Sequence, residues 1–233
     1  MSGRLYERPT NRPSLAYAAL AFAVLFGVLT AFVVARQTSA LDLDLILSLR
    51  SGAEPWLTAM FLAITFTSGK LAIPAAIAFA ITLYYRGDAR GAAYYAGTCI
   101  AAQLLNAILK YSVARPRPHG ISPRLTAAGG MSYPSADAML AVVIFGLGTY
   151  MVSETIRSQA VSRSARALAA AFIVLAAIAR VYLGAHWPTD VLGGTLAGLA
   201  CATFGFAVLR RPPEILIPVA ETPPALPGAE SHG

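Results

Sequence analysis

The chain has 233 residues, of which 57% are hydrophobic and only 12% are charged. Soluble domains average about 25% charged residues, so the composition excludes an ordinary water-soluble globule, and its hydrophobicity excludes an intrinsically disordered chain. Two cysteines cannot make a disulfide scaffold. The net charge of +7 lies between apolar blocks rather than in one basic stripe, which argues against a nucleic-acid partner. The composition therefore predicts an integral membrane protein.

Six apolar runs are long enough, or almost long enough, to cross a bilayer. A spanning helix needs about 20 residues, because a rise of about 1.5 Å per residue must cover roughly 30 Å of hydrocarbon. The fold is therefore predicted to be all-α, a six-transmembrane helical bundle. In chain order the predicted spans are 14–35, 67–85, 91–109, 138–153, 167–185 and 191–209.

Three segments near the N-terminus need an interpretation. The first run has 22 uncharged residues, more than the roughly 7 to 15 of a signal-peptide core, so it is interpreted as a retained helix. Lys70 interrupts the second apolar stretch, so residues 56–66 are expected to form a shallow or re-entrant helix outside the span 67–85. Residues 41–49 alternate apolar and acidic side chains. They fit a helix along the outer surface near a lipid entrance and a core-facing amphipathic helix equally well.

The placement of arginine predicts the orientation, because short cytoplasmic loops of membrane proteins are enriched in basic residues. By the parity of the predicted spans, ten arginines share one side, so both termini are expected in the cytoplasm. Residues 1–13 are then a cytoplasmic tail, 14–211 the membrane domain, and the proline-rich residues 212–233 a disordered cytoplasmic tail. The ten are Arg4, Arg8, Arg12, Arg86, Arg90, Arg157, Arg163, Arg166, Arg210 and Arg211.

A second group of charged residues lies at the opposite, outward ends of the predicted spans and does not follow this bias. Ionisable groups at membrane depth are costly unless they pair or function, so their joint pattern points to a site. Taken singly, Lys110 fits a snorkelling anchor and Arg124 a solvated loop charge. The group comprises Lys110, Arg115, Arg117, Arg124, Asp137, Arg180 and Asp190, with His119 and His186 beside them.

The residue types in this group suit a phosphate. Guanidinium groups match phosphate oxygens and lysine adds a point charge, so Lys110, Arg117 and Arg180 could share three equatorial oxygens. Ser135 follows Pro134 at the head of a predicted span, where unpaired N–H groups favour an anion. The predicted ligand is a phosphate group.

His186 and Asp190 supply a candidate catalytic pair. They stand four residues apart, the spacing that places side chains on one helical face. A neutral histidine whose Nδ1 proton is held by aspartate presents Nε2 as a nucleophile. This chemistry needs no metal and no cofactor, and none is expected. Cys99 and Cys201 are interpreted as packing residues.

The spacing of these residues resembles that of the type 2 phosphatidic acid phosphatase superfamily of membrane lipid phosphatases. Lys110 to Pro118 matches its first motif, K-x6-R-P, and Arg180 to Asp190 matches the core of its third, S-R-x5-H-x3-D. The resemblance implies six spans, an outward-facing site and a phosphorylated lipid as substrate. It also implies that His186 becomes phosphorylated, that Asp190 orients it, and that Lys110, Arg117 and Arg180 bind phosphate.

The sequence departs from the family pattern at two positions. The second motif, P-S-G-H, reads Pro134-Ser135-Ala136-Asp137 here, and Ala179 stands where the third motif usually begins with serine. The missing histidine is the family's general acid, so Asp137 is a candidate catalytic residue with altered chemistry. A carboxylate among cations is expected to be ionised and to donate protons poorly. His119 is an alternative proton donor or an idle loop residue.

Three functional interpretations remain open. The first is an active lipid phosphatase or phosphotransferase at the outer membrane face, favouring a lipid diphosphate such as a polyprenyl diphosphate, because phosphate leaves easily without a proton. The second is an impaired homologue that binds a phosphorylated lipid or a partner. The third, a transporter, has only Gln103, Asn106 and the Gly69–Lys70 break in its favour. The expected location is a bacterial inner membrane, with the site facing the periplasm.

Overall fold

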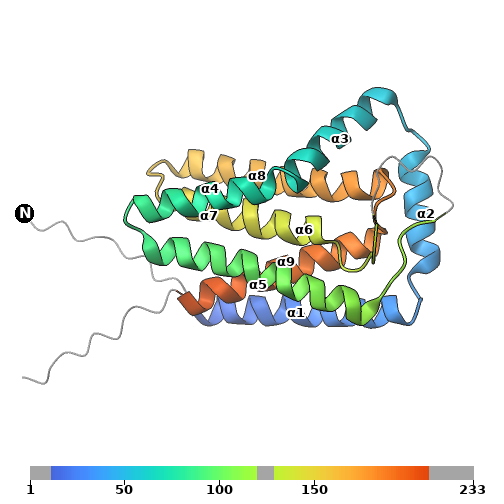
Figure 1. Ribbon diagram of the computed structural model, residues 1–233, viewed down its shortest axis with the longest axis horizontal. Coiled ribbons are helices and arrows are strands. Elements are labelled where there is room, and N and C mark those ends of the chain that lie inside the picture. The colour runs from blue at the N-terminus through green and yellow to red at the C-terminus, as the bar shows by residue number, and fades with distance from the viewer. Residues whose placement is uncertain (1–11, 120–128, 210–233) are drawn as a thin grey trace, which may run out of the picture.

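The computed structural model describes residues 12–119 and 129–209, and every regular element within those residues is helical (Figure 1). The predicted all-α class is therefore confirmed. In chain order the elements are α1 (Arg12–Val34), α2 (Ser39–Arg50), α3 (Pro55–Gly69), α4 (Ala72–Tyr85), α5 (Ala89–Val113), α6 (Ala136–Ala141), the π-helix η1 (Val142–Leu147), α7 (Gly148–Ser153), α8 (Gln159–Tyr182) and α9 (Pro188–Leu209).

Five helices in this part of the chain are long and apolar enough to cross a membrane. They are α1, α5, the run of residues Ala136–Ser153 formed by α6, η1 and α7, α8 and α9. A sixth span results if the bent pair α3 and α4 crosses as one unit. The structure thus agrees with five to six spans.

The predicted helix over residues 67–85 is wrong in its boundary. α3 continues to Gly69, and the chain bends by 42° before α4 begins at Ala72. Pro74 explains the break, because its ring clashes with the carbonyl of the residue four positions earlier, Lys70, in a continuous helix. In the first turn of a new helix the same proline is tolerated, so α4 begins just ahead of it.

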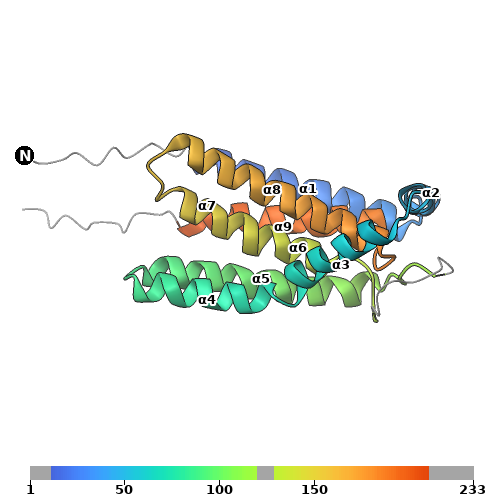
Figure 2. The same ribbon diagram turned by 90° about the horizontal axis from the view of Figure 1, so that it is seen from above.

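The two ends of the bundle carry different parts of the chain. The connections from α4 to α5 and from α7 to α8 lie at the end where α1 begins and α9 ends (Figure 1). At the other end lie α2, the C-terminal end of α5, the start of α6, and the junction of α8 with α9 (Figures 1 and 2). The loops are therefore sorted between the two ends as the parity of the spans predicts.

Helix α9 packs closely inside the bundle because glycines line its contact face. A side chain on Gly193 would meet the ring of Tyr133 at 2.7 Å, and one on Gly194 would collide with the carbonyl of Ser135. One on Gly198 would meet the carbonyl of Met139 at 2.7 Å. These glycines draw the start of α9 against α6, and so bring the residues at both helix starts together.

Helix α2 lies across the end of the bundle (Figures 1 and 2). Asp42 and Ile46 are buried against the bundle, as expected of a core-facing helix, while five leucines are exposed. The exposed leucines are Leu41, Leu43, Leu45, Leu47 and Leu49. α2 is thus an amphipathic helix that covers the end where α5, α6, α8 and α9 meet.

Candidate active site

The chain leaves α5 in a way that presents Arg115 and Arg117 at this end of the bundle. α5 ends at Ala114 in the left-handed conformation, with φ of 49°. Pro116 and Pro118 then prevent the helix from continuing and favour extended backbone. The two arginines therefore project from an extended segment beside the α8–α9 junction.

His186 lies in that junction and is buried, with 1% of its surface exposed. Arg117 Nη1 lies 3.1 Å from His186 Nε2, and it also donates to the carbonyl of Ala185 at 2.7 Å. Arginine is always protonated in proteins and has no acceptor, so Nε2 must be the acceptor of this hydrogen bond. The neutral ring therefore carries its proton on Nδ1, and the lone pair of Nε2 faces the guanidinium group.

The Nδ1 side of the ring faces Asp190. Nδ1 lies 3.5 Å from Oδ2 of Asp190, slightly beyond an ordinary hydrogen bond of about 2.7–3.2 Å. Nδ1 is buried and has no hydrogen-bond partner within the described part of the chain, so Asp190 is the acceptor nearest to it. Catalytic hydrogen bonds are often long before substrate binds and shorten afterwards.

Burial lowers the pKa of His186 below its ordinary value of about 6.5. The nearby carboxylate of Asp190 raises the pKa, while the positive charges of Arg117 and Arg180 lower it further. The ring is therefore neutral at pH 7, the form in which Nε2 can attack.

Asp190 is held by groups on three sides. Its Oδ2 accepts a short hydrogen bond from the Ser132 hydroxyl and one from the Trp187 backbone N–H at 2.8 Å. Its Oδ1 accepts from Arg115 Nη1 at 2.7 Å. The carboxylate is fully buried, so this set of donors fixes its orientation toward His186.

Arg180 and Asp137 form an ion pair at the edge of the site. Nη2 of Arg180 lies 2.7 Å from Oδ2 of Asp137, and their side chains are 12% and 27% exposed. Nε of Arg180 is buried and lacks a hydrogen-bond partner within the described residues. The pair leaves a donor on Arg180 that can bind an additional oxygen.

Lys110 and Ser135 complete the predicted set. Nζ of Lys110 donates to the carbonyl of Met131 at 2.9 Å, which leaves two of its three protons for other acceptors. Ser135 is buried and caps the start of α6, where its hydroxyl accepts from the Ala138 N–H at 3.4 Å. All seven predicted site residues therefore lie at one end of the bundle.

A family model, described as the PAP2 superfamily, matches residues 91–213, more than half of the chain and the region that contains all seven residues. The chain belongs to the PAP2 superfamily. The resemblance inferred from the motifs is confirmed, and the superfamily is one of membrane lipid phosphatases.

Individual PAP2 proteins are similar to this chain in sequence and fold. Phosphatidylglycerophosphatase B from Bacillus subtilis (strain 168) is 36% identical over 98 residues, which cover 42% of this chain and 47%, about half, of that relative. The crystal structure of a transmembrane PAP2-type phosphatidylglycerolphosphate phosphatase from Bacillus subtilis matches with a TM-score of 0.76 at 23% identity, over 82% of this chain and 96% of that one. Aquifex aeolicus LpxE matches with a TM-score of 0.57 at 22% identity, over 71% and 94% of the two chains. The two structures confirm the transmembrane PAP2 fold.

The sequence analysis missed two groups that hold this PAP2 site together. Arg115 was grouped with the basic residues, but its bridge between two buried carboxylates was not predicted. Asp42 was treated only as part of an alternating segment, although it is fully buried and accepts from Arg115 Nη2 at 2.6 Å. An aspartate in an otherwise leucine-rich helix was the available signal.

His119 and Arg124 are the two remaining residues of the predicted outward-facing group. His119 is exposed, and Arg124 lies outside the described residues. Within residues 12–119 and 129–209, no three His, Cys, Asp or Glu side chains gather in a way that could hold a metal ion.

Proposed function

We propose that this PAP2 protein is a lipid phosphatase in which His186 is the nucleophile and a phosphohistidine is the intermediate. The observation that carries the proposal is the contact of Arg117 with Nε2 of His186 at 3.1 Å. It requires the tautomer with a lone pair on Nε2, and it directs that lone pair toward a cation that binds phosphate.

A phosphate group would enter between Arg117 and His186. Its equatorial oxygens would accept from Arg117, Lys110 and Nε of Arg180, which lacks a partner within the described residues. Nε2 would then attack phosphorus in line with the leaving oxygen, forming a P–N bond while the P–O bond breaks. The electron pair would depart with the leaving group, and Asp190 would stabilise the positive charge on the imidazole ring. Water would subsequently attack phosphorus, the P–N bond would break with its electron pair returning to Nε2, and both water protons would leave with the product as dihydrogen phosphate, which restores neutral His186.

The position of Asp137 supports a substrate whose leaving group needs no proton. Its carboxylate forms an ion pair with Arg180 at 2.7 Å, so it accepts from a cation instead of standing as a proton donor to a leaving group. An alkoxide leaving from a phosphate monoester needs an acid, whereas phosphate leaving from a diphosphate is already stable. The preferred substrate is therefore a lipid diphosphate, such as a polyprenyl diphosphate, with transfer of the phosphoryl group to another lipid as a variant of the same chemistry.

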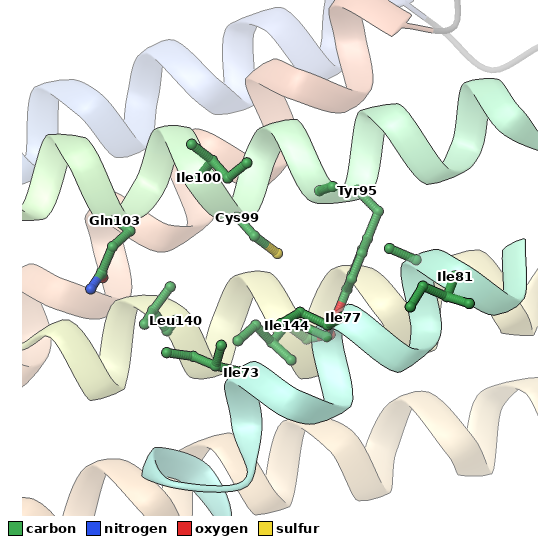
Figure 3. A pocket seen from close by; sticks show the side chains of 12 residues that line it. Ile73, Ile77, Ile81, Tyr95, Cys99, Ile100, Gln103, Leu140 and Ile144 are labelled. Atoms are coloured by element: carbon green, nitrogen blue, oxygen red, sulfur yellow. Dashed lines mark hydrogen bonds between the residues drawn. The ribbon is translucent and has the colours of Figure 1, made fainter. Parts of the chain in front are cut away.

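An apolar groove between α4 and α5 supports a lipid as the substrate (Figure 3). It has a volume of about 450 Å³ and is lined mainly by alanine and isoleucine, with Leu140 and Ile144 at its floor. Gln103, which lines it, stands seven residues before Lys110 on α5, so this part of the groove lies about 10 Å along the helix from the lysine. A hydrocarbon chain in the groove would leave its phosphorylated head group close to the site.

We further infer that the site faces the periplasm and that both termini are cytoplasmic. Arg86 and Arg157 belong to the connections at the end of the bundle opposite the site, and Arg90 lies in the first turn of α5 at the same end (Figure 1). The positive-inside rule assigns that end to the cytoplasm. In this arrangement residues 14–211 are the phosphatase domain, and residues 1–13 and 212–233 are cytoplasmic tails.

Phosphate release by the purified protein in detergent micelles tests the proposal. Wild type is expected to release phosphate from a polyprenyl diphosphate faster than from phosphatidic acid, and vanadate, which imitates five-coordinate phosphorus, is expected to inhibit. His186→Ala should release none from either lipid. A clear preference for the monoester would contradict the role given to Asp137.

The ion pair of Arg180 with Asp137 also favours a second candidate, an impaired homologue that only binds a phosphorylated lipid. In this protein Asp137 competes with phosphate for Arg180 and replaces the expected general acid. The homologue is supported if wild type retains phosphorylated lipid but releases no phosphate from any lipid tested.

A further inference from the structure

We propose that Asp42 on α2 is a positioning residue for the phosphatase reaction, because it holds Arg115 and the first turn of α9 and so keeps Asp190 aimed at His186 and able to accept its Nδ1 proton. This inference rests on the proposed role of His186. It assigns a catalytic purpose to α2, a helix outside the region that contains the family motifs.

The contacts of Asp42 reach two elements of the site. Its Oδ1 accepts from the backbone N–H of Thr189 at 2.9 Å, and its Oδ2 accepts from the Thr189 hydroxyl at 2.7 Å. The same Oδ2 accepts from Arg115 Nη2 at 2.6 Å. Thr189 directly precedes Asp190, so Asp42 fixes the backbone from which Asp190 projects.

Arg115 connects the two carboxylates. One nitrogen, Nη2, donates to Asp42, and the other, Nη1, donates to Asp190 at 2.7 Å and to the Thr189 hydroxyl at 2.8 Å. The guanidinium group also lies 5.4 Å from the ring centroid of Trp187. With both carboxylates fully buried and the Arg115 side chain only 12% exposed, water screens these charges weakly.

The sharing of one cation between two carboxylates affects the reaction. When Nε2 of His186 binds phosphorus, positive charge develops on the ring and Asp190 must offset it. If Arg115 were paired with Asp190 alone, the positive charge of Arg115 would cancel much of the stabilisation that Asp190 gives to the charged ring of His186. Asp42 draws part of the guanidinium charge to itself, so Asp190 remains an effective acceptor for the Nδ1 proton.

Charged groups other than Asp190 also lie around His186, and the effect of Asp42 adds to theirs. Arg117 contacts Nε2 from the segment after α5, and Arg180 acts from α8. Arg50 at the end of α2 lies near the junction, with Nη1 3.3 Å from the position that a Cβ on Gly184 would take. None of these groups is altered by a substitution at Asp42, which makes its effect separable.

The experiment compares wild type with Asp42→Asn, which keeps the shape of the side chain and removes its charge. Asp44→Asn is the matched control, because it removes the same charge from an exposed position of the same helix. Asp42→Asn should lower kcat roughly tenfold, as is usual when a partner that orients a functional histidine is lost. KM should change little, because Asp42 does not contact the phosphate site, and Asp44→Asn should behave as wild type.

A second measurement does not depend on turnover. The chain has three histidines, so NMR of protein labelled in its imidazole nitrogens can follow the titration of each, with His186→Ala assigning the signal. Asp42→Asn should lower the pKa of His186 below its wild-type value, since a negative charge near the ring is lost. The double variant Asp42→Asn with Arg115→Gln also removes the positive charge of Arg115, which Asp42 no longer shares with Asp190. In this variant the pKa of His186 should return to the wild-type value or above.

The results separate a positioning role from simple support of the fold. If Asp42→Asn lowers the melting temperature while the kcat of the folded protein and the pKa of His186 stay at wild-type values, the proposal is overturned. If Asp42→Asn does not fold, the double variant decides, since it removes one negative and one positive charge and so keeps the net charge of the buried cluster at its wild-type value: a His186 pKa below that of wild type overturns the proposal. A wild type that turns over no lipid contradicts the proposed function, but the NMR comparison still tests the link from Asp42 to His186.

Discussion

Two carboxylates at the site, Asp190 and Asp137, lie in contrasting surroundings. Asp190 is fully buried and accepts from Arg115, Ser132 and the Trp187 backbone, so its position is fixed. Asp137 is 27% exposed and is paired with Arg180, whose Nε lacks a partner within the described residues. The site therefore has a closed, preorganised part around His186 and a more open part around Asp137 and Arg180, and under the proposed function the open part is the one that rearranges around phosphate.

The closed part should be the more sensitive to substitution. Asp190→Asn is expected to lower kcat on the order of 10³-fold, because an amide stabilises neither the required tautomer of His186 nor the charge that develops on it. The same change removes one of the two carboxylates that Arg115 bridges and leaves Asp42 as its remaining ion pair, so the free energy of unfolding should fall by roughly 1–3 kcal/mol. Phosphate release and thermal unfolding check the two effects. Turnover close to that of wild type would remove Asp190 from the mechanism.

Substitution of Arg180 in the open part should affect binding more than folding. Arg180→Gln is expected to lower kcat/KM by about 10²-fold, since one donor to the equatorial oxygens is lost. Arg163→Gln is the control, because it removes the same charge from an exposed position of the same helix. An equal loss of activity in the two variants would indicate that Arg180 acts only through the overall charge of the protein.

Replacement of Asp137 tests whether the open part of the site determines the preference between a phosphate monoester and a diphosphate. Asp137→His removes the competitor for Arg180 and restores a side chain that can donate a proton. Turnover of phosphatidic acid should rise at least about tenfold relative to turnover of a polyprenyl diphosphate, the lower end of the range for general acid catalysis. An unchanged ratio of the two rates would show that residue 137 does not set the choice of leaving group.

The apolar groove between α4 and α5 lies outside both the closed and the open part of the site. A substitution there should change the binding of the lipid chain. Ala96, which lines it, can be replaced by phenylalanine to fill the space between α4 and α5. Ala96→Phe is expected to raise KM for a long-chain substrate several-fold, because a few buried methylenes at roughly 0.8 kcal/mol each are lost. A short-chain diphosphate is the control substrate and should keep its kinetic constants. Equal changes for both chain lengths would contradict a tail site here.

The pH dependence of kcat/KM reports directly on His186 in the closed part of the site. Protonation of His186 removes the lone pair on Nε2, so kcat/KM should decrease as the pH falls through the pKa of this residue. Since burial places that pKa below its ordinary value, the decrease is expected below about pH 6.5. A profile measured between pH 4 and 8 on a stable sample checks this, and an acidic limb centred above pH 7 would contradict a buried neutral nucleophile.

The residues of the site could be found from the sequence because its chemistry depends on residue type and spacing. Lys110, Arg117, Arg180, His186 and Asp190 stand out as charges at the ends of apolar runs, where a charge needs a reason. The structure places them at one end of the bundle, as expected. The boundary between the two helices was predicted between residues 66 and 67 instead of after Gly69, because the effect of Pro74 on the residue four positions earlier was not considered.

The sequence by itself determined the helical membrane fold, the positions of most spans and the motif residues, because hydrophobic length and residue spacing along one chain are local properties. Only the tertiary structure decided which charges meet. It paired Asp137 with Arg180, placed Nε2 of His186 against Arg117, and brought Asp42 of α2 to Arg115 and Thr189 across 73 and 147 positions of the chain. Such pairings depend on how helices distant in sequence pack and on which buried groups require a partner, and no local pattern records either.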